Sequence, residues 1–172
     1  MPALTSAGAS GYGRQQTFSG YTYYRFTPSG STTTQVARVY FYTGSNKQTV
    51  FSDSTPSAVT VTNPGGSNPV GEGPANANLA ANPVGNSKWL DFNNGSLIFQ
   101  FPTRQFFTGY EWYTANDTQT ETVRQPTSWT ISGSYDNITY KTLHSANTSS
   151  PGYLGITNNS LAYSIRNAWN NA

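Results

Sequence analysis

The sequence has no cysteine, few charged residues and no long apolar run. Without cysteine, stability has to come from packing, and a single histidine does not supply the usual set of zinc ligands. Charged residues make up 9% of the 172 residues, well below the usual value of about 25%. The nine basic and seven acidic residues are spread singly, so no basic stripe indicates nucleic-acid binding. No segment approaches the roughly 20 apolar residues of a membrane span, and we expect no membrane insertion.

The opening segment, MPALTSAGASGYG, has neither the charged part nor the apolar part of a signal peptide. We therefore expect synthesis in a host cytoplasm without export by that route. Residues 1–20 are small and polar and predict an extended N-terminal arm, whereas residues 21–172 predict one domain. The arm has too little apolar content to fold on itself. We expect it to pair through its backbone with a neighbouring subunit, anchored by Tyr12 and Phe18.

Aromatic residues, by contrast, make up 15% of the chain, and glycine, proline, serine, threonine and asparagine are abundant. This composition is typical of many short strands joined by turns. Period-two alternation predicts about eight or nine strands, almost no helix, and an all-β antiparallel sandwich. The strand-like runs are residues 21–27, 36–43, 48–51, 58–62, 89–92, 97–101, 109–114, 128–134, 138–143 and 161–165.

The faces of these runs predict which side chains are buried. The expected core residues are Phe26, Phe41, Trp89, Phe99, Phe101, Trp112, Trp129 and Ile131. Arg38, Tyr40 and Tyr42 alternate with apolar neighbours and are expected to face outward. The Asn93-Asn94-Gly95 segment between two runs predicts a β-hairpin. Residues 143–154 are predicted to be a loop.

Three ordered groups of residues carry a resemblance to a known family. They are Tyr110-x-Trp112-x-Thr114-Ala115-Asn116-Asp117, then Arg124-Gln125-Pro126-x-Ser128-Trp129, then Gly133-Ser134-x-Asp136. This order resembles the middle of a discoidin (F5/8 type C) domain. Gly71-Glu72-Gly73-Pro74, Lys88-Trp89-Leu90-Asp91-Phe92 and Tyr23-Tyr24-Arg25-Phe26 are similar to further family segments. Together they extend the resemblance over most of the chain after the arm.

The resemblance implies a galactose-binding-like β-sandwich of the jelly-roll kind. Many members of the family hold a structural calcium ion, partly through carboxylate oxygens. Here the family's Asn-Leu-x-Asp-Gly pattern is Asn78-Leu79-Ala80-Ala81-Asn82, so Ala81 replaces the carboxylate. Gln125 likewise stands where the family has a second aspartate. We therefore expect no cofactor, with calcium as the one alternative.

Polar and aromatic residues near strand ends are candidates for binding. Tyrosine rings, arginine forks and amides serve both sugar recognition and protein contact, and the sequence does not separate the two uses. The candidate residues are Tyr113, Asn116, Asp117, Arg124, Tyr135 and Asn137.

Signals for catalysis are weak. No nucleophile-elbow motif accompanies the single histidine, His144. Glu111 and Asp117 would serve a glycosidase only if their carboxyl groups lay about 5–10 Å apart across a cleft. Structural roles for both carboxylates are the simpler interpretation, and we expect a non-catalytic protein.

The first functional hypothesis is a structural and binding component of a phage virion, such as a capsid decoration, fibre or tail subunit. The missing signal peptide, the absent cysteine, the low charge and the arm favour it, with other virion subunits as partners. The alternative is a stand-alone carbohydrate-binding or cell-attachment module that recognises a cell-surface glycan. The two are compatible, since a virion protein can display a glycan-binding face. A glycoside hydrolase is the third hypothesis.

Overall fold

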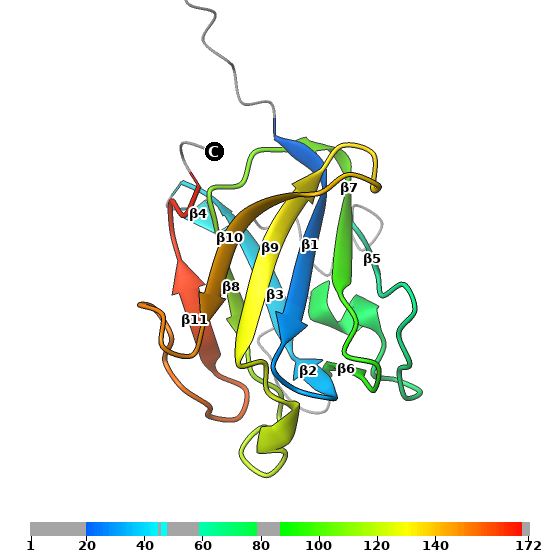
Figure 1. The fold of residues 1–172 in the computed structure, drawn as a ribbon, viewed down its shortest axis with the longest axis vertical. Coiled ribbons are helices and arrows are strands. Elements are labelled where there is room, and N and C mark those ends of the chain that lie inside the picture. The colour runs from blue at the N-terminus through cyan, green and yellow to red at the C-terminus, as the bar shows by residue number, and fades with distance from the viewer. Residues whose placement is uncertain (1–19, 45, 48–58, 79–86, 170–172) are drawn as a thin grey trace, which may run out of the picture.

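The computed structural model describes residues 20–44, 46–47, 59–78 and 87–169, and these residues form antiparallel strands (Figure 1). The strands are β1 (Tyr21–Ser29), β2 (Thr34–Val36), β3 (Arg38–Thr43), β4 (Asn46–Lys47), β5 (Thr60–Thr62), β6 (Trp89–Asp91), β7 (Leu97–Gln105), β8 (Gly109–Tyr113), β9 (Ser128–Ser134), β10 (Lys141–Asn147) and β11 (Leu161–Ile165). Helix within this part is limited to two short 3₁₀ turns, η3 (Pro74–Asn78) and η4 (Thr122–Arg124). None of its helices has the length and apolar character needed to cross a membrane. The expected all-β class is confirmed.

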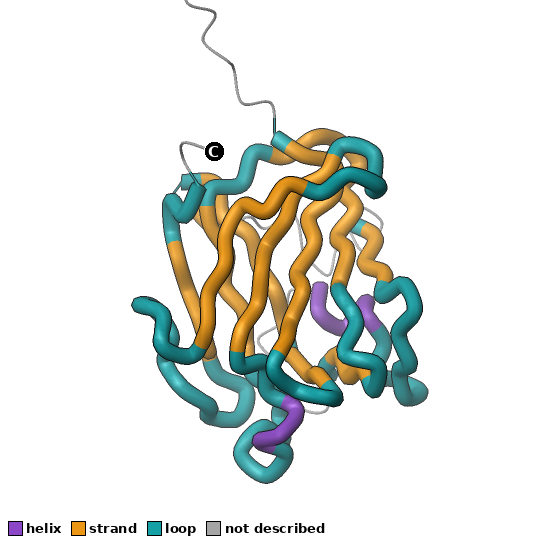
Figure 2. The backbone as a smooth tube through the Cα atoms, viewed as in Figure 1, coloured by secondary structure: helices purple, strands orange, loops and turns teal. Residues whose placement is uncertain are grey.

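Two sheets pack face to face as a β-sandwich, and a small third sheet lies beside them (Figure 2). The larger sheet has the strand order β10-β9-β1-β7-β5, the second has the order β11-β8-β3-β4, and β2 pairs with β6. Aromatic rings join the two main sheets across the core. Trp112 on β8 meets Trp129 on β9 with ring centroids 5.1 Å apart, and Phe41 on β3 meets Phe99 on β7 at 5.3 Å.

All eight predicted core residues are buried, each with at most 1% of its surface exposed. They are Phe26, Phe41, Trp89, Phe99, Phe101, Trp112, Trp129 and Ile131. The prediction is correct because large aromatic side chains at alternate strand positions gain most by facing the other sheet.

The prediction that Arg38, Tyr40 and Tyr42 face outward into solvent is wrong, since each is at most 4% exposed. They do alternate with Val39 and Phe41 on β3, but other parts of the chain cover them. The Arg38 guanidinium donates to the carbonyl oxygens of residue 76 at 2.7 Å and residue 87 at 3.0 Å. The Tyr42 hydroxyl donates to Glu111, and the Arg166 guanidinium lies 3.4 Å from the centre of the Tyr42 ring. Alternation separates the two faces of a strand but does not show what covers the outer one.

Two further local predictions are wrong. The strand expected at residues 138–143 is β10, which spans Lys141–Asn147 and includes part of the predicted loop. It starts late because the Asp136 carboxylate accepts the N–H groups of Ile138 and Thr139, both at 2.9 Å, and holds them in a turn. The predicted hairpin does not form either, since β6 pairs with β2 whereas β7 pairs with β1 and β5. The strand predicted at residues 48–51 lies outside the described residues.

The pairing registers give the sandwich two distinct ends. β1 runs from Tyr21 to Ser29, and the loops at its two termini belong to opposite ends. We call these the Tyr21 end and the Ser29 end. β8 finishes and β9 begins at the Ser29 end, whereas β9 finishes and β10 begins at the Tyr21 end.

Candidate functional site

The six predicted binding residues do not form one site. They lie near opposite ends of β9. Tyr113, the last residue of β8, lies at the Ser29 end with Asn116, Asp117 and Arg124, whereas Tyr135 and Asn137 lie at the Tyr21 end. Seven residues of extended strand separate the two groups, a distance of roughly 20 Å. Each end therefore has to be considered on its own.

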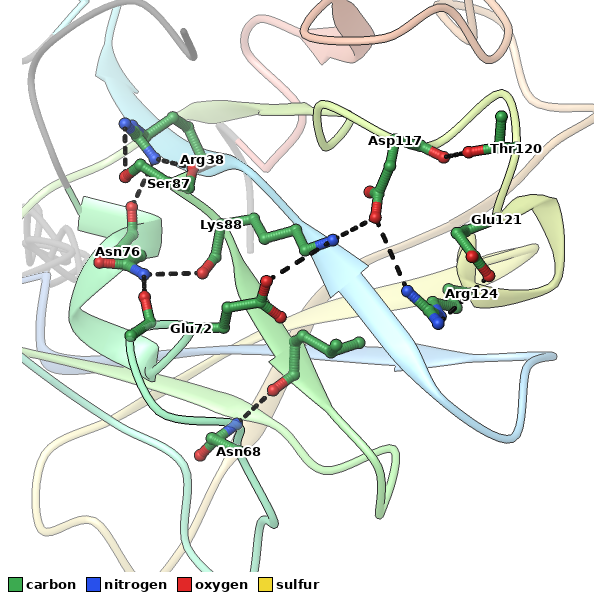
Figure 3. Close-up of polar contacts among 12 residues, drawn as sticks. Arg38, Asn68, Glu72, Asn76, Ser87, Lys88, Asp117, Thr120, Glu121 and Arg124 are labelled. Atoms are coloured by element: carbon green, nitrogen blue, oxygen red, sulfur yellow. Dashed lines mark hydrogen bonds and ion pairs between the residues drawn. The ribbon is translucent and has the colours of Figure 1, made fainter. Parts of the chain in front are cut away.

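A chain of alternating charges fixes the loops at the Ser29 end (Figure 3). The Lys88 Nζ atom is buried and lies 2.5 Å from the Asp117 carboxylate and 3.9 Å from that of Glu72. Arg124 lies 3.7 Å from Asp117 and 3.2 Å from Glu121. Two of the predicted binding residues, Asp117 and Arg124, thus contact each other and hold the 115–126 loop against the segment that precedes β6.

Arg38 and Asn76 hold η3 against the same part of the molecule (Figure 3). In addition to its bonds to η3 and residue 87, Arg38 donates to the Ala37 carbonyl at 2.6 Å. The Asn76 side-chain amide donates to the carbonyls of Gly71 at 2.6 Å and Lys88 at 2.8 Å. The roles of Arg38 and Lys88 were not predicted from the sequence. An available signal was that each basic residue directly adjoins a strongly apolar strand run.

Glu111 lies among tyrosine hydroxyl groups and is 3% exposed. The hydroxyls of Tyr42 and Tyr113 both donate to its carboxylate, the latter at 3.1 Å. Burial, followed by the nearby Glu111 charge, raises the pKa of Tyr113 well above its ordinary value. A glycosidase would need Glu111 to face a substrate cleft together with Asp117. In this structure Glu111 is covered and Asp117 is engaged by Lys88 and Arg124.

The turn at the Tyr21 end is organised by Asp136. Its carboxylate accepts the Ser134 hydroxyl at 2.9 Å as well as two backbone N–H groups. The backbone N–H bonds, chiefly that of Thr139, lower the pKa of Asp136. Tyr135 is 48% exposed, and its ring is contacted by Tyr21 at 4.8 Å and by the Arg104 guanidinium at 4.7 Å. Asn137 has a φ of 62° and accepts the Tyr140 hydroxyl, so the turn is held by its own side chains.

His144 belongs to a hydrogen-bonded chain between the sheets. The Trp129 indole N–H donates to the Tyr110 hydroxyl oxygen at 2.8 Å. That hydroxyl lies 3.0 Å from Nδ1 of His144 and serves as the donor when the neutral imidazole carries its proton on Nε2. Burial lowers the pKa of His144, which favours this neutral form. His144 is thus linked through the Tyr110 hydroxyl to the buried Trp129, which gives the imidazole a structural role.

Carboxylates for a calcium site are sparse in the described part of the chain. Gln125 is 4% exposed, and its side-chain oxygen accepts the Thr118 hydroxyl at 3.2 Å. The described residues contain no group of three or more His, Cys, Asp or Glu side chains arranged so that it could hold a metal ion. Ala81 and most of its sequence pattern, residues 79–82, lie outside the described residues.

A neutral groove on the larger sheet was not predicted from the sequence. Its volume is about 300 Å³, and it lies at the Ser29 end of β1, β9 and β10. It is lined by Ser29, Ser128, Trp129, Thr130, Ser145, Ala146, Asn147 and Ser150. Ser29, Ser128 and Asn147 are register partners across three strands, and Thr130 pairs with Ser145. The signal in the sequence was the alternation of small polar residues with Trp129, Ile131 and Gly133 along β9.

A scan against protein-family models, a search of curated proteins and a search of solved structures each found no match to this chain.

Proposed function

We propose that this chain is a non-catalytic binding module with a discoidin-like, jelly-roll β-sandwich, and that its groove binds a neutral cell-surface glycan. We further propose that it does so as a surface component of a phage virion. The observation that carries the binding proposal is the groove of about 300 Å³ lined by hydroxyl and amide groups.

The chemistry of the lining favours an uncharged, hydroxyl-rich ligand. Serine and threonine hydroxyls both donate and accept, as sugar hydroxyls do. None of the described residues that line the groove is charged, so a charged ligand would lose hydration there without gaining a partner from them. Within the described part of the chain, the hydroxyls of Thr130 and Ser145 make no hydrogen bond. These two groups are therefore available to a ligand.

The geometry of the sheet spaces these groups regularly. Neighbouring strands lie about 4.8 Å apart, and outward-facing residues on one strand follow each other at about 6.7 Å. Ser29 and Ser128 are already joined by a 2.7 Å hydrogen bond between their hydroxyl oxygens, which orders that side of the groove. The turn after β10 closes the other side, because the Ser150 hydroxyl accepts the backbone N–H of Asn147 at 2.9 Å. A preformed site of this kind loses little entropy on binding.

NMR titration of the full chain tests the proposal. We expect neutral oligosaccharides such as galactotriose or maltotriose to shift the backbone amide signals of Thr130 and Ser145, and sialyllactose to shift them less. Replacing both hydroxyls in a Thr130→Val, Ser145→Ala double variant should weaken binding about tenfold, the sum of two neutral hydrogen bonds.

The matched control is Thr142→Val, which removes another exposed hydroxyl from β10 outside the groove. It should leave the affinity unchanged. Equal losses in the control and the double variant, or no shift with any neutral saccharide, would exclude the groove as the site. Release of shorter sugars from the titrated oligosaccharide would instead favour the third hypothesis, a glycoside hydrolase.

The virion location rests on the sequence features given above. Gold-labelled antibody against the chain, viewed by electron microscopy on intact particles of its source, tests that location. We expect label on the particle surface. Glycan binding without label on any particle would favour the stand-alone carbohydrate-binding module.

A further inference from the structure

The exposed apolar side chains of the sandwich gather at its two ends. Among the described residues, the large hydrophobic side chains with high exposure all lie in connections between strands. Val70, Phe92 and Val123 lie at the Ser29 end, and Phe106, Tyr135 and Ile138 lie at the Tyr21 end. The remaining two, Leu154 and Ile156, lie in the segment between β10 and β11. These exposed side chains are the apolar groups that a contact at either end would bury.

The same two ends differ in the sign of their charge. The described side chains of the network at the Ser29 end comprise three carboxylates, from Glu72, Asp117 and Glu121, and two basic groups, from Lys88 and Arg124, a net charge of −1. At the Tyr21 end, the described charged side chains that are exposed are those of Arg104, Lys141, Arg166 and Asp136, a net charge of +2. Opposite charges attract across an interface and fix which surfaces meet.

The edges of the sheets offer less to a partner than the ends do. The outer edge of β11 is already bonded, since Leu154 N–H donates to the Ala162 carbonyl at 2.8 Å and Tyr153 bridges to Tyr163. β5, at one edge of the larger sheet, has three residues. β10, at the other edge, begins with a lysine and changes register between Thr142 and His144. Short, charged or bulged edge strands oppose pairing with another chain.

We infer that copies of this chain associate head to tail, with the Ser29 end of one copy against the Tyr21 end of the next. The unlike ends decide this orientation, because a symmetric contact would place two ends of the same charge together. A contact between two different surfaces leaves one surface of each kind free and continues into a ring or a filament. This inference names a partner for the proposed structural role and does not depend on the groove: a chain that stays monomeric can still bind saccharide.

Sedimentation velocity on the full chain tests the inference. We expect the weight-average mass to rise with protein concentration at about 0.02 M salt and to rise less at about 0.5 M, where charges are screened. Ile138→Asp alters the Tyr21 end and Val123→Lys alters the Ser29 end. Each places a charge repelled by the partner end on a side chain that is 83% and 75% exposed, respectively, so neither should affect folding. Each variant alone should associate at least tenfold more weakly than the unaltered chain.

Mixing the two variants gives the decisive result. Ile138→Asp keeps an intact Ser29 end and Val123→Lys keeps an intact Tyr21 end, and the introduced aspartate and lysine attract each other where the two altered ends meet. An equimolar mixture should therefore recover the association that each variant loses alone. Gln100→Glu, which adds a charge to an exposed position of the larger sheet, is the control and should associate like the unaltered chain. A chain that is monomeric up to millimolar concentration, or single variants that form dimers without mixing, would overturn the inference.

Discussion

At the scale of single residues, Asp91 is the acceptor on which two loops depend. One of its oxygens accepts the backbone N–H groups of Ser67 at 2.6 Å and Asn93 at 3.1 Å. The other accepts the Gly95 N–H at 2.5 Å and the Asn63 amide at 3.4 Å. Asp91 itself is fully buried. This capture of the turn after β6 also explains why no hairpin forms there.

Replacing Asp91 with alanine should therefore be costly. The substitution leaves three backbone N–H groups and the Asn63 amide without the acceptor that Asp91 supplies, and we expect the free energy of unfolding to fall by about 2–4 kcal/mol. Urea denaturation measures the loss. Asp136→Ala is the comparison, since the Asp136 carboxylate also accepts backbone N–H groups but is fully exposed. A loss at Asp91 no larger than at Asp136 would show that the loops do not depend on this carboxylate.

His144 predicts how stability varies with pH. Burial lowers its folded-state pKa below the ordinary value of 6.5, so the unfolded chain takes up a proton first as the pH falls. The contribution of His144 to the free energy of unfolding is therefore fully present above about pH 6.5. It is lost as the pH falls towards the folded-state pKa. Protonation also removes the Nδ1 acceptor that faces the Tyr110 hydroxyl.

We expect the urea midpoint to fall between about pH 7.5 and about pH 5 in the unaltered chain and to change less in His144→Gln. Asp136, whose pKa is lowered from 3.8, acts in a separate window, since its contribution is lost only as the pH falls below that value. An equally steep fall in His144→Gln between the same two pH values would assign the effect to another group.

At the scale of elements, the ion pair between Lys88 and Asp117 joins the loop after β8 to the residue before β6. The Lys88 side chain is 4% exposed and that of Asp117 is 27% exposed, so the pair is only partly screened by solvent. A double-mutant cycle with Lys88→Met and Asp117→Asn should give a coupling energy of about 1–3 kcal/mol. The cycle on Arg124 and Glu121, whose side chains are 26% and 40% exposed, should give about 0.5 kcal/mol or less. Equal coupling energies would mean that burial does not strengthen the ion pair between Lys88 and Asp117.

These elements also show what a sequence reveals about such a fold. Trp129 and Phe26 were predicted to be buried because alternation on one strand is a local property that the chain itself displays. The cover over Arg38 is supplied by η3 and residue 87, which are distant in sequence. The start of β10 depended on which N–H groups Asp136 captures, and two turn residues alone do not decide that. The groove likewise requires the register of three strands, which places Ser29 beside Ser128 and Asn147.

At the scale of the whole molecule, the main question is what the N-terminal arm contributes. Residues 1–19, the predicted arm, lie outside the described residues, and Gly20 is the first described residue of the sandwich. Gly20 has a φ of +64°, and a Cβ atom there would lie 2.2 Å from the Gln105 carbonyl oxygen. Only glycine fits so close an approach with that backbone conformation. The described chain therefore begins at the Tyr21 end, which is one of the two surfaces inferred to meet another copy.

A shortened chain that begins at Gly20 separates folding from assembly. The buried core described here lies entirely within residues 21–169, so we expect the melting temperature of the shortened chain to change little. If the arm pairs with a neighbouring copy, as the sequence predicts, the shortened chain should associate more weakly than the full chain in sedimentation experiments. Some association should remain, because the charged and apolar ends are intact.

Restoring the arm with Tyr12→Ser and Phe18→Ser tests whether these two aromatic residues anchor it. If the shortened chain associates as strongly as the full one, the arm plays no part in assembly, and the ends of the sandwich account for the whole contact.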